Sequence, residues 1–233
     1  MEILGFIENS FIDWDGKITS VIFLGGCNFN CPYCQNGPIV KRAKLLRRFK
    51  TFEILDYLKK NKKFIDGVVI SGGEPLINPA LPELIKVFKA EGFLVKLDTN
   101  GYFYFNLLSL IEENLLDYVA MDIKTSFEKY EKAVGRKIEL SLIKKSIALL
   151  KEGKVDYEFR TTLVPKLVNE QDLLLIKEEL VGAKRWVLQR FVNESAKSKR
   201  YQKIKPYPKE EAERFLKILK SDNKIKEIYL RGY

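Results

Sequence analysis

The feature that most constrains the fold of this chain is an alternation of strand-like and helix-like segments, repeated about six times. Short apolar runs that are rich in β-branched and aromatic residues, and bounded by Gly, Asn, Asp or charged residues, predict strands. They occur at Ile18–Gly25, Asp66–Ser71, Phe93–Thr99, Leu115–Ile123, Val155–Val164 and Lys184–Phe191. The alternation indicates an α/β fold with a parallel sheet. On this evidence alone, an incomplete β/α barrel and a doubly wound sheet both remain open.

The segments between these strands carry apolar residues at every third or fourth position, which is typical of amphipathic helices. We expect helices at 51–63, 81–92, 105–114, 139–153 and 170–180, with Gly92 and Gly153 as C-terminal caps, and a last helix at Lys209–Lys220. A further strand-like run, IKEIYLRG, follows that helix. The N-terminal GFIENSFIDWDGK predicts a short hairpin with its turn at Asp15–Gly16.

The chain of 233 residues, 46% of them hydrophobic, can bury one sizeable core. We therefore expect a single domain. Its predicted parts are an N-terminal hairpin extension at 1–17, a β/α core at 18–191 and a C-terminal extension at 192–233.

Polar motifs lie at the carboxyl ends of the first four predicted strands, and a polar residue lies late in the fifth. In order along the chain they are Cys27, Cys31 and Cys34, then SGGEP at 71–75, DTNG at 98–101, MDIK at 121–124, and Arg160. In parallel α/β folds the carboxyl ends of the strands converge on one rim, where ligands bind. The sequence therefore predicts one site built from all five motifs.

The three cysteines form the most specific of these motifs, with the spacing CxxxCxxC, and they are the only cysteines in the chain. Three thiolates on one loop can hold three irons of a 4Fe-4S cluster and leave the fourth iron open to a substrate or cofactor. A zinc site is an alternative, but it needs a fourth ligand from Asp or water because the chain has no histidine. Inert buried thiols are the third interpretation.

The chain shows no signal for export or for a membrane. No apolar run reaches the roughly 18 residues of a membrane span. The start, MEILGFIENSF, lacks a basic region followed by an apolar run and a cleavage site. An odd number of closely spaced cysteines also argues against disulfides. We therefore expect a cytoplasmic protein without a membrane partner.

The formal net charge is +10, from 41 Lys and Arg against 31 Asp and Glu. Basic residues are densest in Lys41–Lys50 and in Ala196–Lys209. These segments could dock an acidic protein or nucleic acid, but solvated faces of a lysine-rich protein are the favoured interpretation, so a nucleic-acid partner is not expected. The absence of histidine excludes imidazole-based catalytic triads, and no GxxxxGKS/T phosphate loop occurs.

The segment GCNFNCPYC, followed after the next strand by SGGEP, resembles the radical S-adenosylmethionine superfamily, whose signature has an aromatic residue where this chain has Tyr33. The N-terminal segment up to Asn36, together with DTNG and MDIK, resembles more narrowly the glycyl-radical-enzyme activating enzymes, such as those of anaerobic ribonucleoside-triphosphate reductase and pyruvate formate-lyase. The resemblance is strongest over Gly5–Lys124. It implies a partial (β/α)6 barrel with an N-terminal β-hairpin.

This resemblance implies a 4Fe-4S cluster on Cys27, Cys31 and Cys34, with S-adenosylmethionine as the second cofactor. The cofactor-binding residues that it implies are Tyr33, Asn36, Gly72, Gly73, Glu74, Asp98, Asn100, Lys124 and Arg160. In this assignment Tyr33 lies against the adenine, the two glycines let backbone approach the methionyl group, Glu74 favours its ammonium group and the two cations favour its carboxylate. Gln35 stands where the family usually has a histidine.

The resemblance also implies a monovalent cation held by Asp98, Thr99 and Asp122, with a backbone carbonyl at Ala120. Carboxylate and carbonyl oxygens suit a hard cation. Ordinary salt bridges at the strand ends are the alternative interpretation.

The implied activity is reductive cleavage of S-adenosylmethionine to a 5′-deoxyadenosyl radical, which abstracts hydrogen from a glycine of a partner enzyme, here an anaerobic ribonucleoside-triphosphate reductase. Reduced flavodoxin or ferredoxin would donate the electron. An alternative is a small-molecule radical enzyme such as a 7-carboxy-7-deazaguanine synthase. A zinc-stabilised nucleic-acid-binding module is a third hypothesis from a different class.

Overall fold

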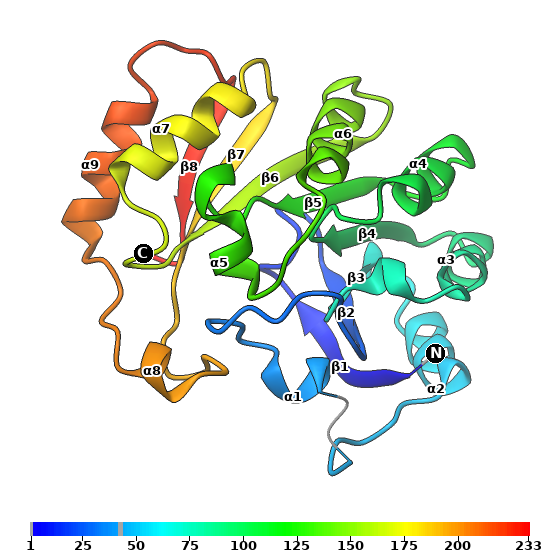
Figure 1. The fold of residues 1–233 in the computed structure, drawn as a ribbon. Helices are drawn as coiled ribbons and strands as arrows, with labels where there is room; N and C mark the ends of the chain where they lie inside the picture. The colour runs from blue at the N-terminus through cyan, green and yellow to red at the C-terminus, as the bar shows by residue number, and fades with distance from the viewer. Residues whose placement is uncertain (1, 42–43) are drawn as a thin grey trace. The chain divides into compact units, whose positions relative to one another are not determined.

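The computed structural model describes residues 2–41 and 44–233 (Figure 1). Arg42 and Ala43, which belong to the run Lys41–Lys50 that is rich in lysine and arginine, lie outside the described residues. The strands are β1 (Ile3–Ser10), β2 (Thr19–Leu24), β3 (Gly67–Gly72), β4 (Leu94–Thr99), β5 (Tyr118–Asp122), β6 (Asp156–Leu163), β7 (Arg185–Arg190) and β8 (Glu227–Arg231).

The helices connect these strands. They are α1 (Gly37–Val40), α2 (Thr51–Lys60), α3 (Leu81–Ala90), α4 (Tyr104–Glu112), α5 (Tyr130–Val134), α6 (Leu140–Lys151), α7 (Glu170–Glu179), α8 (Lys199–Gln202) and α9 (Lys209–Leu219). Two 3₁₀ turns, η1 (Pro75–Ile77) and η2 (Phe127–Lys129), are further elements.

The chain divides into two compact units, and each is described by itself. The first consists of the described residues of 1–28, 38–120 and 154–156, and the second of residues 29–37, 121–153 and 157–233. The predicted division into 1–17, 18–191 and 192–233 stays a prediction.

The sheet of the first unit begins with β1, which pairs with β2 in antiparallel orientation, while β2, β3 and β4 are parallel. The predicted N-terminal hairpin is present, but its second strand is β2, which we had expected to follow the hairpin rather than to form it. Leu24 pairs with Gly72. The segments that leave β2 and β3 therefore start at the same level of the sheet.

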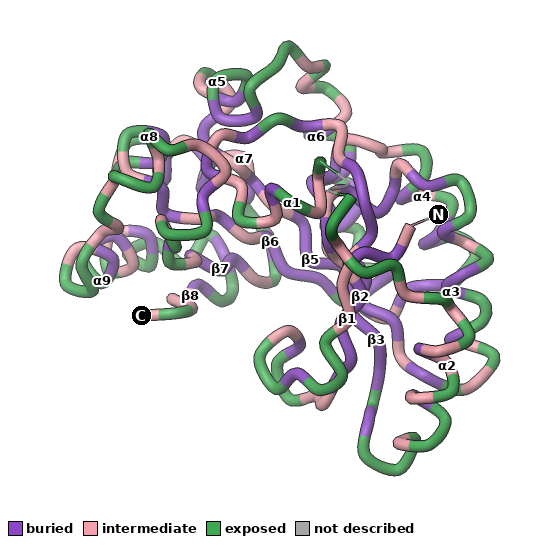
Figure 2. Tube along the Cα trace, turned by 90° about the horizontal axis from the view of Figure 1, so that it is seen from below, coloured by how far each residue is buried: buried purple, intermediate pink, exposed green. Residues whose placement is uncertain are grey.

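The core of the first unit follows from its strands. Both β2 and β3 are almost continuously buried, as expected for parallel strands covered on both faces (Figure 2). Trp14, from the loop after β1, packs with Val21, Val69, Tyr118 and Ala120. The N-terminal segment thus supplies part of the core, and α2, α3 and α4 lie along the strands of this unit (Figure 1).

The sheet of the second unit contains the parallel strands β6, β7 and β8. Phe159, Trp186 and Ile228 form one buried row across these strands. Because side chains alternate along a strand, the next row, Arg160, Val187 and Tyr229, points to the opposite face. Helix α9 packs against β8 and α7. This face of the second unit therefore carries the charged Arg160 next to the fully buried Val187.

The predicted strands and long helices are confirmed, most of them to within three residues. Gly92 and Gly153 follow α3 and α6 with positive φ, as their predicted capping role requires. Three short helices, α1, α5 and α8, were not predicted. Among the described residues, no helix has the length and apolar character needed to cross a membrane.

Candidate active site

The predicted site residues are distributed over both units. The first unit carries Cys27, Gly72, Gly73, Glu74, Asp98, Thr99 and Asn100, and the second carries Cys31, Tyr33, Cys34, Asn36, Asp122, Lys124 and Arg160. All three cysteines are free thiols; Cys31 is buried and the other two are partly exposed. Each half of the site has its own supporting contacts.

In the first unit, the two glycines of SGGEP allow close contact between backbone segments. Gly72 has a φ of 118°, and a Cβ there would lie 2.4 Å from backbone atoms of Leu24. A Cβ on Gly73 would lie 1.8 Å from the carbonyl oxygen of Gly26. In the structure these glycines accommodate the chain that leads into Cys27. Their predicted role in the approach of a cofactor stays a prediction.

The same contact is completed by backbone hydrogen bonds. Gly73 N–H donates to the carbonyl oxygen of Leu24 at 3.0 Å, and Glu74 N–H donates to that of Gly26 at 2.9 Å. The end of β3 therefore holds the segment entering the cysteine loop through main-chain hydrogen bonds.

The Glu74 side chain is fully buried and connects two strand ends. Its Oε1 accepts from Thr99 Oγ1 at 2.8 Å and from Leu76 N at 3.2 Å, and its Oε2 accepts from Asn100 N at 2.7 Å. A buried carboxylate needs such donors, because desolvation disfavours the charge. Glu74 thus positions the DTNG segment, and its predicted contact with an ammonium group stays a prediction.

Asn28 connects Cys27 to the end of β4, a role that we did not predict. Its Oδ1 accepts from Asn100 Nδ2 at 2.7 Å and is 3.8 Å from Cys27 Sγ. Asp98 accepts a hydrogen bond from Ser71 Oγ at 3.0 Å, which again joins β4 to β3. An asparagine directly after the first cysteine was the only available sequence signal for the role of Asn28.

In the second unit, backbone hydrogen bonds hold the segment that carries the other two cysteines. Asn30 N–H donates to Val134 O at 2.8 Å, and Cys34 N–H donates to Cys31 O at 3.3 Å. Tyr33, between these cysteines, is buried, and its ring lies 6.2 Å from that of Tyr201. Its hydroxyl has no hydrogen-bond partner among the described residues. The predicted contact of Tyr33 with adenine stays a prediction.

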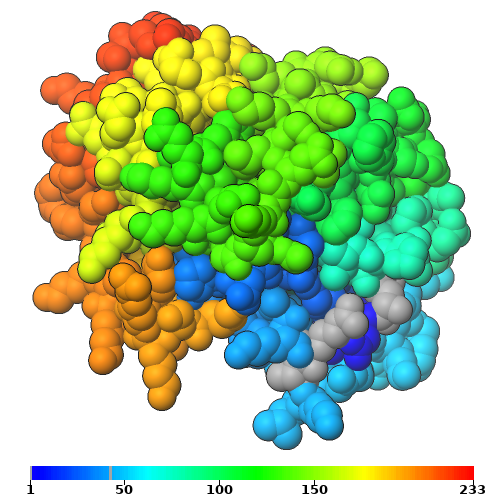
Figure 3. Space-filling view, viewed as in Figure 1, coloured from blue at the N-terminus to red at the C-terminus, as the bar shows by residue number. Residues whose placement is uncertain are grey.

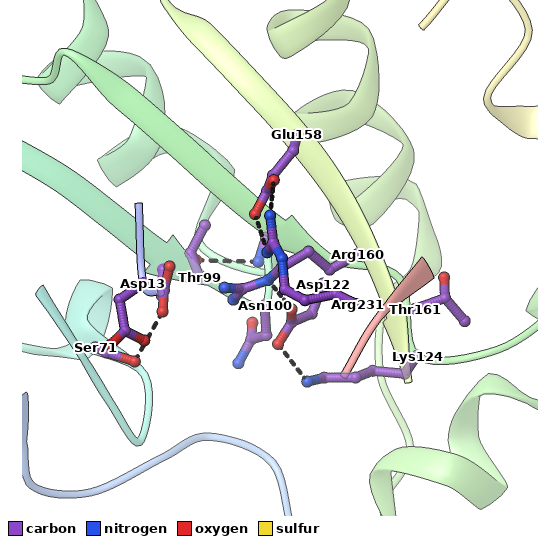
Figure 4. Close-up of polar contacts among 12 residues, drawn as sticks. Asp13, Ser71, Thr99, Asn100, Asp122, Lys124, Glu158, Arg160, Thr161 and Arg231 are labelled. Carbon is purple, nitrogen blue, oxygen red and sulfur yellow. Dashed lines mark hydrogen bonds and ion pairs between the residues drawn. The ribbon is translucent and has the colours of Figure 1, made fainter. Parts of the chain in front are cut away.

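Three charged side chains converge at the end of β5. Asp122 Oδ1 accepts from Arg160 Nε at 2.8 Å, and Asp122 Oδ2 accepts from Lys124 Nζ at 2.8 Å (Figure 4). Burial alone would raise the pKa of the Asp122 carboxyl, but the charges of Arg160 and Lys124 lower it to about 2. Asp122 is therefore ionised at neutral pH.

Lys124 also influences the cysteine segment. Burial alone would lower the pKa of its ammonium group, but Asp122, Tyr33 and Cys31 raise this pKa well above its usual value. In turn, burial raises the pKa of the Cys31 thiol, and the positive charge of Lys124 opposes that shift. A permanent cation beside Cys31 favours the thiolate, which is the form that binds metal.

A second ionic group lies on the same strand face of β6. Glu158, which is 1% exposed, accepts from Arg231 Nη1 and Nη2 at 3.0 Å each, so that β6 and β8 are joined by a bidentate pair (Figure 4). We did not predict this pair. An acidic residue two positions before Arg160, and thus on the same face of the strand, was its sequence signal.

The residues that follow the third cysteine lie nearer the surface. Asn36 is partly exposed and Gln35 is exposed. Within residues 2–41 and 44–233, no three His, Cys, Asp or Glu side chains are grouped as ligands for a metal ion. The cation site at Asp98, Thr99 and Asp122 stays a prediction.

Comparison with protein families and curated proteins shows which proteins this chain resembles. Residues 21–179 match the family described as the radical SAM superfamily. A protein of Methanocaldococcus jannaschii with the provisional name glycyl-radical enzyme activating enzyme is 37% identical over 217 residues, which cover 89% of this chain and 87% of that protein. A 7-carboxy-7-deazaguanine synthase of Haemophilus influenzae is 32% identical over 119 residues, 50% of this chain and 49% of that one.

Among solved structures, Streptococcus suis SuiB bound to its precursor peptide SuiA superposes with a TM-score of 0.70. The sequences are 13% identical, and the match covers 91% of this chain and 48% of the SuiB chain. At that identity the likeness shows the fold alone, and it agrees with the predicted α/β partial barrel.

Proposed function

Because this chain belongs to the radical S-adenosylmethionine superfamily, and within it to the glycyl-radical enzyme activating enzymes, we propose that it creates a glycyl radical on a partner enzyme. The observation that carries the proposal is the likeness to the M. jannaschii protein over 89% of the chain. The synthase of H. influenzae matches only half of it. A 4Fe-4S cluster and S-adenosylmethionine are the cofactors of this superfamily.

We assign the cluster to Cys27, Cys31 and Cys34. The donor set fits, because the chain offers three free thiols, no fourth cysteine and no histidine. One iron then remains for the amino-acid end of the second cofactor. When bound, the two cofactors supply an electron and a primary carbon radical, so the protein needs no general base for hydrogen abstraction.

The protein's own residues then hold and orient these groups. In this proposal Glu74, already oriented by Thr99 and Asn100, faces the ammonium group of S-adenosylmethionine. Lys124 and Arg160, held by Asp122, favour its carboxylate. Tyr33 contacts its adenine, while Gly72, Gly73, Asn36, Asp98 and Asn100 shape the rest of the pocket.

A monovalent cation at Asp98, Thr99 and Asp122 is part of the same proposal. Both carboxylate oxygens of Asp122 already accept from Lys124 and Arg160, so the cation would share this carboxylate with them. Activity measured in potassium and in tetramethylammonium buffers tests this assignment, because the larger ion cannot enter an oxygen-lined site.

We further propose anaerobic ribonucleoside-triphosphate reductase as the partner, a reduced flavodoxin or ferredoxin as electron donor, and the cytoplasm as the compartment. The test incubates the reconstituted, reduced protein with S-adenosylmethionine and each candidate glycyl-radical protein under anaerobic conditions. We expect a glycyl doublet by electron paramagnetic resonance with one of them, together with 5′-deoxyadenosine.

The second candidate function, a small-molecule reaction like that of 7-carboxy-7-deazaguanine synthase, is favoured by the match to the H. influenzae enzyme. If 5′-deoxyadenosine forms only with a small heterocycle and the doublet never appears, the activating function is wrong.

A further inference from the structure

Residues 196–209, here called the basic segment, concentrate positive charge in the second unit. The segment contains six cationic residues, Lys197, Lys199, Arg200, Lys203, Lys205 and Lys209, and no acidic residue. Helix α8 lies within it, and its side chains project from the surface (orange in Figure 3).

The basic segment is hydrogen-bonded to the segment that carries Cys31 and Cys34. Lys197 N–H donates to Cys34 O, and Ser198 N–H donates to Pro32 O, both at 2.9 Å. The Lys197 ammonium group also donates to the Asn30 side chain. Helix α8 therefore begins directly beside these two cysteines.

Four cations of the second unit surround an open concavity of about 470 Å³. Lys199, Arg200 and Lys203 come from α8 and its end, Ile204 adds an apolar patch, and Lys166 comes from the loop after β6. Lys166 has a φ of 74°, which is uncommon for a residue with a side chain. We call this feature the basic concavity.

Among the described residues, no acidic side chain pairs with a cation of the basic concavity. Elsewhere in the unit, Lys129 and Lys144 lie within 3.0 Å of carboxylates. In the part of the chain that the structure describes, none of the four cations around the concavity forms such an ion pair, and all four are exposed. Like charges that converge without counterions create a positive field that attracts anions.

We propose that the basic concavity docks an acidic electron-carrier protein. This proposal rests on the proposed function, which requires one electron to be delivered at the cysteine loop. The reduced carrier, a flavin or iron–sulfur protein, loses one electron, the cluster gains it, and no bond or proton needs to move. Transient electron-transfer complexes have small interfaces that are steered by charge. This fits a compact patch of four cations, three of which come from the helix that begins beside Cys31 and Cys34 or from its end.

The test measures binding of a flavodoxin with net negative charge to the reconstituted protein by isothermal titration calorimetry, at low and at high salt. In the triple variant Lys199→Glu, Arg200→Glu, Lys203→Glu, we expect Kd at low salt to rise at least about tenfold. We also expect the salt dependence to diminish. The rate at which reduced flavodoxin bleaches the cluster absorbance should fall in parallel.

The matched control is Lys62→Glu, Lys63→Glu, Lys217→Glu, which changes the net charge equally at exposed positions outside the concavity. We expect its Kd to stay within about twofold of wild type, since only long-range charge is altered. Both variants should unfold at the wild-type temperature. With dithionite as reductant, both should form 5′-deoxyadenosine at the wild-type rate.

Equal flavodoxin affinity in the two variants would overturn the proposal. The proposal would also be wrong if the Lys199→Glu, Arg200→Glu, Lys203→Glu variant kept its flavodoxin affinity but lost binding to a glycyl-radical protein or to a short DNA duplex. The concavity would then bind a different partner. If flavodoxin binding falls as expected but no glycyl doublet ever forms, the docking surface is supported and the proposed function fails.

Discussion

The two halves of the candidate site are stabilised in different ways. In the first unit, the end of β3 meets the entry to the cysteine loop through backbone hydrogen bonds, and the Glu74 carboxylate accepts from the uncharged groups Thr99 Oγ1 and Asn100 N. In the second unit, the end of β5 is held by the ion pairs of Asp122 with Lys124 and Arg160. The first half should therefore respond mainly to changes in shape, and the second to changes in charge.

The largest effect that we expect comes from Gly73→Ala. The added Cβ would lie 1.8 Å from the carbonyl oxygen of Gly26, and neither backbone segment can move without breaking its hydrogen bonds. We expect a loss of about 3 kcal/mol or more in the free energy of unfolding, measured by urea titration. The control is Gly153→Ala, where the φ of 76° is unfavourable but a Cβ meets open space, and there we expect about 1 kcal/mol. Equal losses would show that contact with the loop does not matter.

Asp122→Asn should destabilise the second unit, because it removes the carboxylate that pairs with Lys124 and Arg160. The variant removes the negative charge that pairs with two largely buried cations, and we expect a loss of about 2 kcal/mol in the free energy of unfolding. The matched control is Glu227→Gln, which removes a more exposed ion pair with Arg185 and should change stability by less than about 0.5 kcal/mol. The contrast between the halves is wrong if Asp122→Asn is as mild as this control.

Acid should weaken the second half through the same carboxylate. An Asp pKa held at about 2 in the folded state lies below the unfolded value of about 3.9, so the stabilisation is present above pH 4 and is lost as the pH falls through about 2. We expect wild type to lose up to roughly 2 kcal/mol more than Asp122→Asn between pH 5 and pH 2. The measurement is chemical unfolding at a series of pH values. If the free energy of unfolding falls with pH equally in the two proteins, Asp122 is not the cause of the acid sensitivity.

The smallest effect should come from Tyr33→Phe. The buried Tyr33 hydroxyl has no partner among the described residues, so its removal should leave the free energy of unfolding within about 0.5 kcal/mol of wild type. Tyr130→Phe is the matched control, because that hydroxyl is in hydrogen-bond contact with the Asp122 carbonyl oxygen and the Lys124 amide, at 3.4 Å each. We expect a larger loss there, about 1 kcal/mol. The reverse order would show that Tyr33 has an internal partner.

The sequence predicted the strands and long helices well because each is long enough to show its hydrophobic pattern. Strands such as β2 and β3 stand out as apolar runs between turn residues, and α6 repeats its apolar positions over three turns. Helices α1 and α8, of four residues each, are too short to show a period. The antiparallel pairing of β1 with β2 depends on contacts between strands, which no local pattern reveals.

The same limit applies to the candidate site. The strand-end position of SGGEP could be predicted, but not that Glu74 accepts from residues 25 and 26 positions later. Glu158 and Arg231 are 73 residues apart, and only the parallel order of β6, β7 and β8 brings them together. Residue types therefore indicated the chemistry of the site. Which partners each carboxylate binds could be learned only from the fold.

The backbone hydrogen bonds of the segment from Asn30 to Cys34 have a consequence for how the protein is assembled and repaired. Val134, Lys197 and Ser198 hold this segment through main-chain atoms, and none of these bonds depends on a metal ion. Zinc fingers, in contrast, fold only when their metal binds. After oxygen has destroyed the cluster, the segment that carries Cys31 and Cys34 should keep its conformation. Iron and sulfide should then rebuild the cluster without refolding of the protein.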